Sequence, residues 1–261
     1  MSSPGPVALL RDGAVATLQL ERAEARNALD TATLAALRGH LAALREDPEV
    51  FAVVLRGSGT RAFCAGADLK ERRTMDEAQV KHFVREIRAT MDDIASLPQP
   101  TIAAINGSAF GGGCEMALSC DLRLMVEEAF IGLTETSLAI IPGAGGCARL
   151  PRLVGAAQAK RMILLAERLS SAEALDCGLV HRLAAPEDFD EALAALLGAL
   201  LANGPLALQA AKAAIDGGLD LPLEGALEHE AACYQRIIPT EDRLEALAAF
   251  AEKRKPVFRG R

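Results

Sequence analysis

The amino-acid sequence predicts an α/β fold, with a largely parallel sheet system covered by helices and a C-terminal region made of helices. Strand-like apolar runs alternate with helical segments up to about residue 180, and helical patterns follow. Of the 261 residues, 51% are hydrophobic, which is enough to bury a large core. We therefore expect an α/β core over residues 1–188 and a helical region over residues 189–261.

The first predicted elements are two strands, a helix and a third strand. Residues 7–20 alternate in polarity around a glycine, which is typical of a hairpin of two short strands. Residues 27–45 place leucines on one face at helical spacing, and Asp30 or Thr31 can cap the start of that helix. Residues 50–55 are apolar throughout and therefore predict a buried strand.

The middle of the chain continues the alternation of strands and helices. Residues 76–95 predict a helix that ends before Pro98, because proline disfavours the helical conformation of the residue before it. Residues 101–105 form another buried apolar run. A short helix over residues 112–119 and a strand over residues 121–126 follow. This order implies parallel strands with helices across their faces.

Four helices are expected after residue 188, and we find no strand candidate beyond Val180. These helices are expected to expose apolar faces, such as Leu193 with Leu196 and Leu197, because four helices could hardly bury them among themselves. We therefore expect the region to pack against other subunits. The helices are predicted at residues 189–202, 205–217, 223–237 and 242–253.

Composition argues against two classes of partner. Aromatic residues make up 3% of the chain and tryptophan is absent, so an aromatic platform for single-stranded nucleic acid is not expected. The net charge of −7 also disfavours a polyanion. No stretch approaches the roughly 18 apolar residues that span a bilayer, so we expect no membrane partner.

The cysteines and the first residues favour a cytoplasmic location. None of the six cysteines forms a C-x-x-C pair and only four histidines are present, so we expect reduced thiols and no metal site. Residues 1–7 lack a positively charged start followed by an apolar run. We therefore expect neither a secretory signal nor a transit peptide.

Two glutamates close to glycine runs are the strongest functional signal. Glu115 follows a run of three glycines, and Glu135 precedes the segment Ile141-Pro142-Gly143-Ala144-Gly145-Gly146. Glycine lets a backbone N–H approach a ligand closely, because no Cβ is in the way. A carboxylate beside such a loop can move protons next to a bound anion, and two carboxylates can divide the roles of base and acid.

The glycines also coincide with predicted helix starts. A helix begins within residues 111–113, and the first N–H groups of a helix lack internal partners and favour an anion. The segment Ala65-Gly66-Ala67 offers a second turn of the same kind. Tight packing is an alternative reason for such glycines. If both turns face one pocket, their two N–H groups can form an oxyanion hole.

Six segments occur in an order that is typical of one known family: residues 65–70, 103–107, 111–115, 141–146, 178–180 and 250–254. Taken in this order, they resemble the crotonase family, the enoyl-CoA hydratase/isomerase superfamily. The resemblance runs from about Val15 to Arg259. It implies a spiral of β-β-α turns as the core, and a helical C-terminal region that packs on neighbouring subunits of a homotrimer or a dimer of trimers.

The resemblance also implies roles for individual residues. The N–H groups of Ala67 and Gly112 would hold the thioester oxygen of an acyl-CoA, and Glu115 with Glu135 would hold the attacking water. Coenzyme A is then part of the substrate, and no separate cofactor or metal is implied. Further substrate contacts are expected from Arg26, Ala65, Asp68, Leu69, Lys70, Gly111, Pro142 and Gly143, and from Phe250 and Lys253 toward the coenzyme A of an adjacent subunit.

Retention of both glutamates favours a hydro-lyase, an enoyl-CoA hydratase of short-chain 2-enoyl-CoA in fatty acid β-oxidation. The similarity is closest to the methylglutaconyl-CoA hydratase branch, which includes an AU-rich-RNA-binding homologue, so a hydratase of leucine breakdown stays open. The helix of residues 30–45 has no lysine and only Arg38, His40 and Arg45 as basic residues. Because phosphate contacts dominate nucleic-acid affinity, we expect no RNA binding.

The chain departs from the family pattern after Gly145-Gly146. The family usually has Thr-Gln-Arg where this chain has Cys147-Ala148-Arg149, and these positions should support the glycine loop before them.

Overall fold

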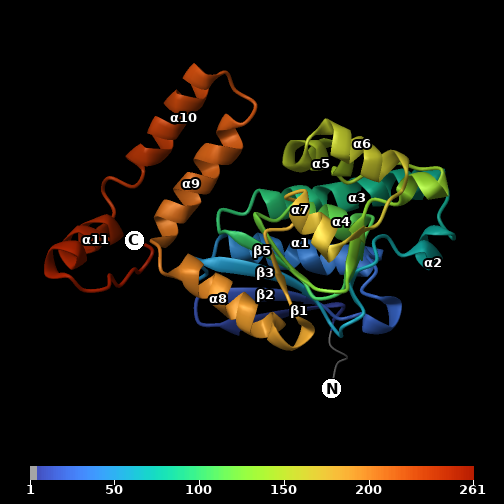
Figure 1. Cartoon of the computed structure of the whole chain (residues 1–261), viewed down its shortest axis with the longest axis horizontal. Helices are drawn as coiled ribbons and strands as arrows, with labels where there is room; N and C mark the ends of the chain where they lie inside the picture. The colour runs from blue at the N-terminus through green and yellow to red at the C-terminus, as the bar shows by residue number, and fades with distance from the viewer. Residues whose placement is uncertain (1–4) are drawn as a thin grey trace.

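The core is built on a six-stranded sheet that is parallel except at one edge (Figure 1). The computed structural model describes residues 5–261. The predicted N-terminal hairpin is confirmed as the antiparallel pair at that edge, and every other neighbouring pair is parallel. The strands, in their order across the sheet, are β1 (Val7–Asp12), β2 (Val15–Leu20), β3 (Ala52–Gly57), β5 (Thr101–Ile105), β7 (Leu122–Val126) and β10 (Arg182–Ala184).

Three strands of the first sheet are each followed, along the chain, by a strand that belongs to a second, four-stranded sheet. Thus β3 leads to β4, β5 to β6 and β7 to β8, and helices come after each pair. This repeat is the spiral of β-β-α turns that the resemblance implies, and that expectation is confirmed. The second sheet has the order β4 (Ala62–Cys64), β6 (Ser108–Phe110), β8 (Phe130–Gly132) and β9 (Leu169–Ser170).

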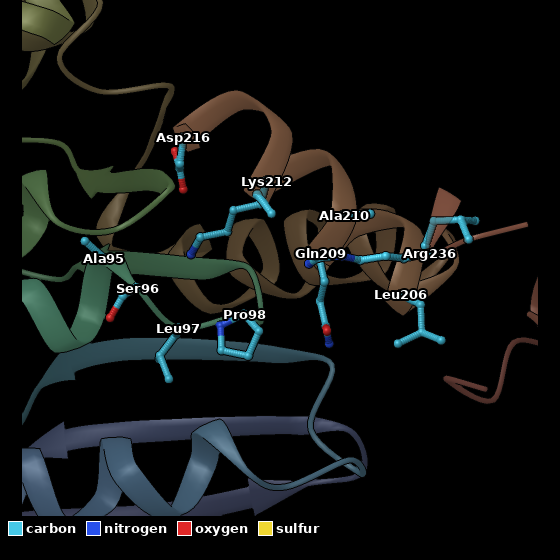
Figure 2. Close-up of a pocket in the computed structure, with 12 residues that line it drawn as sticks. Ala95, Ser96, Leu97, Pro98, Leu206, Gln209, Ala210, Lys212, Asp216 and Arg236 are labelled. Atoms are coloured by element: carbon cyan, nitrogen blue, oxygen red, sulfur yellow. The ribbon is translucent and has the colours of Figure 1, made fainter. Parts of the chain in front are cut away.

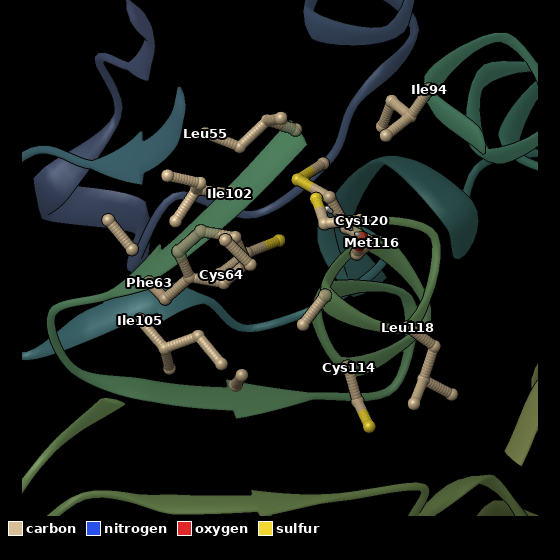
Figure 3. Packing of buried hydrophobic residues seen from close by; sticks show 14 of the residues in the cluster. Leu55, Phe63, Cys64, Ile94, Ile102, Ile105, Cys114, Met116, Leu118 and Cys120 are labelled. Atoms are coloured by element: carbon tan, nitrogen blue, oxygen red, sulfur yellow. Dashed lines mark hydrogen bonds between the residues drawn. The ribbon is translucent and has the colours of Figure 1, made fainter. Parts of the chain in front are cut away.

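Three of the core helices were predicted from the sequence. In α1 (Thr31–Arg45), the side chain of Asp30 caps the start by accepting a hydrogen bond from the Thr33 N–H at 2.8 Å, and the leucine face is buried. The longer α3 (Glu77–Ala95) begins with a capping box. The short α4 (Gly112–Leu118) is buried along its whole length. Figure 3 shows α4 beside the strands that carry Leu55, Phe63 and Ile102.

The buried cysteines belong to this packing. Burial raises the pKa of the Cys64 thiol to about 12 and that of the Cys114 thiol well above its usual value. Both thiols are therefore neutral at ordinary pH, and a thiol is a much weaker nucleophile than a thiolate. Cys114 therefore acts as a small buried hydrophobe in this packing.

Several elements were not predicted. The strands among them have two or three residues, which are too few to display a periodic pattern. Among them is β10, which pairs in parallel with β7 with Leu183 opposite Met125. The expectation of no strand beyond Val180 was therefore wrong. At Ala65-Gly66-Ala67, where a strand is expected to meet a helix, β4 is followed by α2 (Leu69–Arg72). The other unpredicted elements include β6, β8, β9, α5 (Gly146–Val154), α6 (Ala156–Leu164), α7 (Ser171–Asp176), and three 3-10 turns at Ala23–Ala25, Glu135–Leu138 and Pro186–Asp188.

The four predicted C-terminal helices are present. In α8 (Phe189–Leu201), Leu193 is only 9% exposed and Leu196 and Leu197 pack against the core. The expectation that this face is exposed was wrong, because α8 lies on the sheet beside β3. The remaining helices are α9 (Pro205–Gly218), α10 (Leu223–Gln235) and α11 (Glu241–Glu252), and in Figure 1 they extend away from the core.

The helical region leaves large apolar side chains exposed on α9, α10 and α11. Leu223 is 76% exposed and Phe250 is 85% exposed.

Within residues 5–261, no single helix has the length and apolar character to cross a bilayer. Among the described residues, one pair of helices passes such a test together, Pro186–Leu201 and Pro205–Gly218, with a bend of 93° between its members. The division at residue 188 stays a prediction, although α8 begins at Phe189.

Candidate active site

The first part of the site is the turn between β4 and α2. The N–H of Leu29 donates to the Gly66 carbonyl at 2.8 Å, and the N–H of Asp68 donates to the Leu29 carbonyl at 2.8 Å. These bonds fix the turn from both sides. The N–H of Ala67, between them, meets no acceptor in the described part of the chain. Gly66 has a φ of +91°, a conformation that favours glycine.

The second part is the start of α4, which presses directly on that turn. A Cβ at Gly113 would lie 2.1 Å from the Cys64 carbonyl oxygen, so only glycine permits this approach. A Cβ at Gly112 would lie 3.7 Å from the Ala67 nitrogen. The N–H of Gly112 is the first of the helix, and within residues 5–261 it has no hydrogen-bond partner. Two unpaired backbone donors therefore lie side by side, as an oxyanion hole requires.

Glu115 lies in the first turn of α4 and is 3% exposed. Its Oε1 accepts hydrogen bonds from the N–H groups of Ala144 and Gly146, both at 2.8 Å. Burial raises the pKa of this carboxyl group, and the two backbone hydrogen bonds oppose that rise because they favour the ionised form. The side chain is thus fixed in position and oriented by the loop that precedes α5.

Glu135 opens the 3-10 turn Glu135–Leu138 and faces the glycine run. A Cβ at Gly111 would lie 3.2 Å from its Oε1, and its buried Oε2 has no partner in the described part of the chain. Burial, and then the charge of Glu115, raises the pKa of this carboxyl group to about 7. Burial therefore raises the pKa of both carboxyl groups of the pair. Glu127 and Glu128, by contrast, are exposed.

A cavity of about 840 Å³ joins these parts. It contains both glutamates and the two donor turns, and Val84 and Ile87 of α3 contribute to an apolar wall. Arg26, Arg72 and Arg168 bring positive charge to its lining. The guanidinium of Arg168 lies 4.8 Å from the centre of the Phe110 ring. Arg168 was not among the predicted site residues, because it lies in a short irregular segment before β9 that carries no recognisable motif.

The structure brings most of the predicted site residues to this cavity. Its lining includes Arg26, Ala65, Ala67, Leu69, Gly111, Gly112, Glu115, Glu135 and Gly143.

The other predicted residues lie elsewhere. The Asp68 side chain binds Arg22 at 2.9 Å and caps α2, and with Lys70 it lines an adjoining hollow of about 490 Å³. Pro142 is buried behind the loop of residues 143–146. Phe250 and Lys253, at the end of α11, lie outside the cavity of this chain. Their contact with an adjacent subunit stays a prediction.

Another cleft, of about 410 Å³, lies between the end of α3 and the helices α9 and α10 (Figure 2). Asp216 is the only carboxylate among its lining residues, and burial raises the pKa of that group. Lys212, which also lines it, donates to Asp121 at 2.7 Å. This cleft holds no pair of carboxylates beside unpaired backbone donors, so the cavity around Glu115 and Glu135 is the candidate active site.

Comparison with known proteins identifies the family of the chain. The family model for enoyl-CoA hydratase/isomerase matches residues 11–261. The mitochondrial enoyl-CoA hydratase domain-containing protein 2 of Homo sapiens is 46% identical over 254 residues, covering 96% of this chain and 87% of that protein. The mitochondrial methylglutaconyl-CoA hydratase of Homo sapiens is 45% identical over 250 residues, covering 94% of this chain and 74% of that protein.

Solved structures share the whole architecture. The crystal structure of an enoyl-CoA hydratase from Bacillus anthracis is 44% identical and matches with a TM-score of 0.96, covering 98% of this chain and 100% of that chain. The expected crotonase fold with C-terminal helices is confirmed. The unpaired donors at two glycine turns and the glutamate pair therefore lie in a known framework. The chain belongs to the enoyl-CoA hydratase/isomerase family, the crotonase superfamily.

Proposed function

We propose that this protein is an enoyl-CoA hydratase, which adds water across the 2,3 double bond of short-chain 2-enoyl-CoA thioesters. One observation carries the proposal: two buried carboxylates, Glu115 and Glu135, share a cavity with two unpaired backbone donors. Water addition needs a base for water, an acid for the α-carbon and a site for the enolate oxygen. This arrangement can supply all three.

The thioester oxygen binds the N–H groups of Ala67 and Gly112. When water attacks the β-carbon, negative charge moves onto that oxygen, and both hydrogen bonds strengthen. Donors that bind the transition state better than the ground state accelerate the reaction. Both donors are backbone groups in fixed turns, so they need no reorganisation during the reaction.

The surroundings of the two glutamates favour different roles. Glu115 accepts two N–H bonds, which favour its ionised form, so it takes the proton from water. Glu135 has an unpartnered buried oxygen and a pKa of about 7, so it carries the proton that goes to the α-carbon. Because the water and both carboxylates would lie on one face of the substrate, the two parts of water add to the same face.

The pH dependence of kcat/KM tests this division. Glu135 must be protonated at the start, and its pKa of about 7 means that the protonated fraction falls as pH rises. We expect kcat/KM for crotonyl-CoA to fall about tenfold per pH unit above that pKa, and to fall also at acid pH as Glu115 becomes protonated. Initial rates of loss of the enoyl absorbance give the profile. A rate that keeps rising to pH 9, about two units beyond that pKa, would contradict the assignment.

The identity of the acyl group of the substrate is a more specific proposal. Short-chain enoyl-CoA is the favoured substrate, and 3-methylglutaconyl-CoA, of the leucine breakdown pathway, is the alternative. A terminal carboxylate must be paired inside a closed pocket, and Arg72 and Arg168 line this cavity.

We expect kcat/KM for crotonyl-CoA to equal or exceed that for 3-methylglutaconyl-CoA. A preference of more than about 100-fold for the dicarboxylic substrate, about 2.7 kcal/mol, would reverse the order. In that event Arg72→Gln or Arg168→Gln should remove the preference. Arg73→Gln is the control, because Arg73 is exposed and does not line the cavity.

Assembly into a homotrimer, or a dimer of trimers, is also proposed. It is supported by the exposed apolar side chains of α9, α10 and α11, among them Ile215, Leu223 and Phe250. We expect sedimentation to give a species of three or six times the 27.4 kDa chain mass. A single 27.4 kDa species at micromolar concentration would contradict the proposal, because an obligate interface is saturated at that concentration.

A cytoplasmic location stays a further proposal, supported by the six free cysteines.

A further inference from the structure

The loop that holds Glu115 is itself held by an arginine. The Arg149 guanidinium donates from Nη1 to the Ala144 carbonyl oxygen at 3.0 Å. A Cβ at Gly145 would lie 2.1 Å from the same nitrogen, so the guanidinium rests directly on that glycine. Gly145 also has a φ of +109°, which strongly favours glycine. Arg149 therefore contacts the loop between the two N–H groups that bind the Glu115 carboxylate.

Arg149 is anchored in turn on α3. Its Nη2 donates to Oδ1 of Asp92 at 2.6 Å, and Arg88, one turn earlier on α3, donates from Nε to Oδ2 of Asp92 at 3.1 Å. The Arg149 side chain is only 21% exposed, so its geometry is restricted by packing. An ion pair through a planar guanidinium is directional. The chain of contacts runs from α3 through Arg149 and the loop to Glu115.

We propose that Arg149, anchored by Asp92 and Arg88, is a positioning residue that fixes the Glu115 carboxylate where it takes the proton from water. The inference rests on the proposed hydratase function and adds to it. Arg149 does not line the cavity and so acts through the loop. Its contribution is to keep the N–H groups of Ala144 and Gly146 aimed at one oxygen of Glu115.

The charges that face Glu115 agree with this role. Arg149 on α5 and Arg88 on α3 both lower the pKa of Glu115 against the effect of burial, while the charge of Glu135 lies opposite. Burial and the two glutamates raise the pKa of the Cys147 thiol, so it adds no charge at neutral pH. Asp92 is paired with both arginines, which leaves a net positive charge on that side of Glu115.

A purely structural tie between α3 and α5 is the alternative. Such a tie would change the stability of the protein but would not alter the titration of Glu115. The two interpretations therefore differ in the pH profile. They differ also in kcat relative to KM, because misplacing a base by a fraction of an ångström slows the reaction more than it weakens binding.

The test compares Arg149→Gln with Arg152→Gln in the full-length protein. Arg152 lies on the same helix but is exposed and pairs with Asp220. For Arg149→Gln we expect kcat for crotonyl-CoA to fall about tenfold or more with little change in KM. The acidic limb of the profile should move up by about 0.5–1 pH unit, because a cation that favours ionised Glu115 is lost. Arg152→Gln should match the wild type.

Two further variants separate charge from geometry and cover a failure of Arg149→Gln to fold. Arg149→Lys keeps the cation, so the acidic limb should return toward its wild-type pH, while kcat stays low because one ammonium cannot bind both partners in the guanidinium geometry. Asp92→Asn removes an anion, so its acidic limb should not move up, although kcat falls. If all three variants lose only thermal stability, with wild-type profiles, the proposal is overturned.

A failure of the hydratase proposal would be separate and recognisable. It would show as a wild-type protein that does not hydrate enoyl-CoA thioesters. The titration of Glu115 can still be followed then, as the carboxyl C=O stretch in infrared difference spectra against Glu115→Gln. An upward pKa shift of Glu115 in Arg149→Gln supports the positioning role in the absence of turnover, and an unchanged pKa removes it.

Discussion

Glu115→Gln and Glu135→Gln are each expected to slow crotonyl-CoA hydration by about 10²–10⁴-fold, the usual contribution of a positioned base or acid. Glutamine keeps the size of the side chain but can neither accept the proton of water nor deliver one to carbon. At position 115 the amide oxygen can still accept the hydrogen bonds of Ala144 and Gly146, so the fold should be kept. Steady-state rates with crotonyl-CoA measure the loss.

Binding separates this loss from a structural failure. Both variants should retain affinity for a saturated acyl-CoA, measured by calorimetry, because the donors at Ala67 and Gly112 are backbone groups. Glu127→Gln is the matched control, since Glu127 is an exposed acid at the end of β7. Near wild-type turnover by Glu135→Gln would refute its assignment as the acid, whatever the result at Glu115.

Gly113→Ala is expected to lower the free energy of unfolding by about 3 kcal/mol and to abolish most activity. The new Cβ would lie 2.1 Å from the Cys64 carbonyl oxygen and 2.7 Å from its carbonyl carbon. Both are backbone atoms of a buried strand, so α4 has to move away from β4. That movement separates the Gly112 donor from the Ala67 donor and shifts Glu115. Denaturant unfolding and crotonyl-CoA turnover measure the two effects.

Two other glycines provide the controls for stability. Gly198 lies within α8 with no atom within 4 Å of its Cβ position, so Gly198→Ala should stabilise the protein by about 0.5–1 kcal/mol. A Cβ at Gly112 would meet its nearest atom, on Leu29, at 3.4 Å, and Gly112→Ala should fold normally. If Gly113→Ala is as stable as Gly112→Ala, the close approach of α4 to β4 is not required for the fold.

The long elements could be predicted because their patterns repeat many times. The leucine face of α1 and the cap at Asp30 fix that helix locally, and the apolar runs of β3 and β5 can only be buried. The two-residue β9 and the three-residue β10 have no local pattern to read. Their conformation depends on the neighbouring strands with which they pair.

The expected exposure of Leu193, Leu196 and Leu197 failed for a related reason. Periodicity shows that a helix has an apolar face but does not show what covers it. In the folded chain α8 places that face on the sheet, and the exposed apolar side chains lie farther along, on α9 to α11. Only the path of the chain after Phe189 decides between these alternatives.

By itself, the sequence determined the α/β class, the order of the long elements and the chemistry available at Glu115, Glu135 and the glycine turns. Those properties depend on residue types and on spacing along the chain, which are local. The tertiary structure decided that Gly113 lies against Cys64, that two N–H groups stay unpaired side by side, and that Glu135 keeps a buried oxygen without a partner. It also decided that Arg149 reaches the loop around Glu115. Such contacts join segments far apart in the chain, and their distances and burial exist only once the two sheets and α4 have packed together.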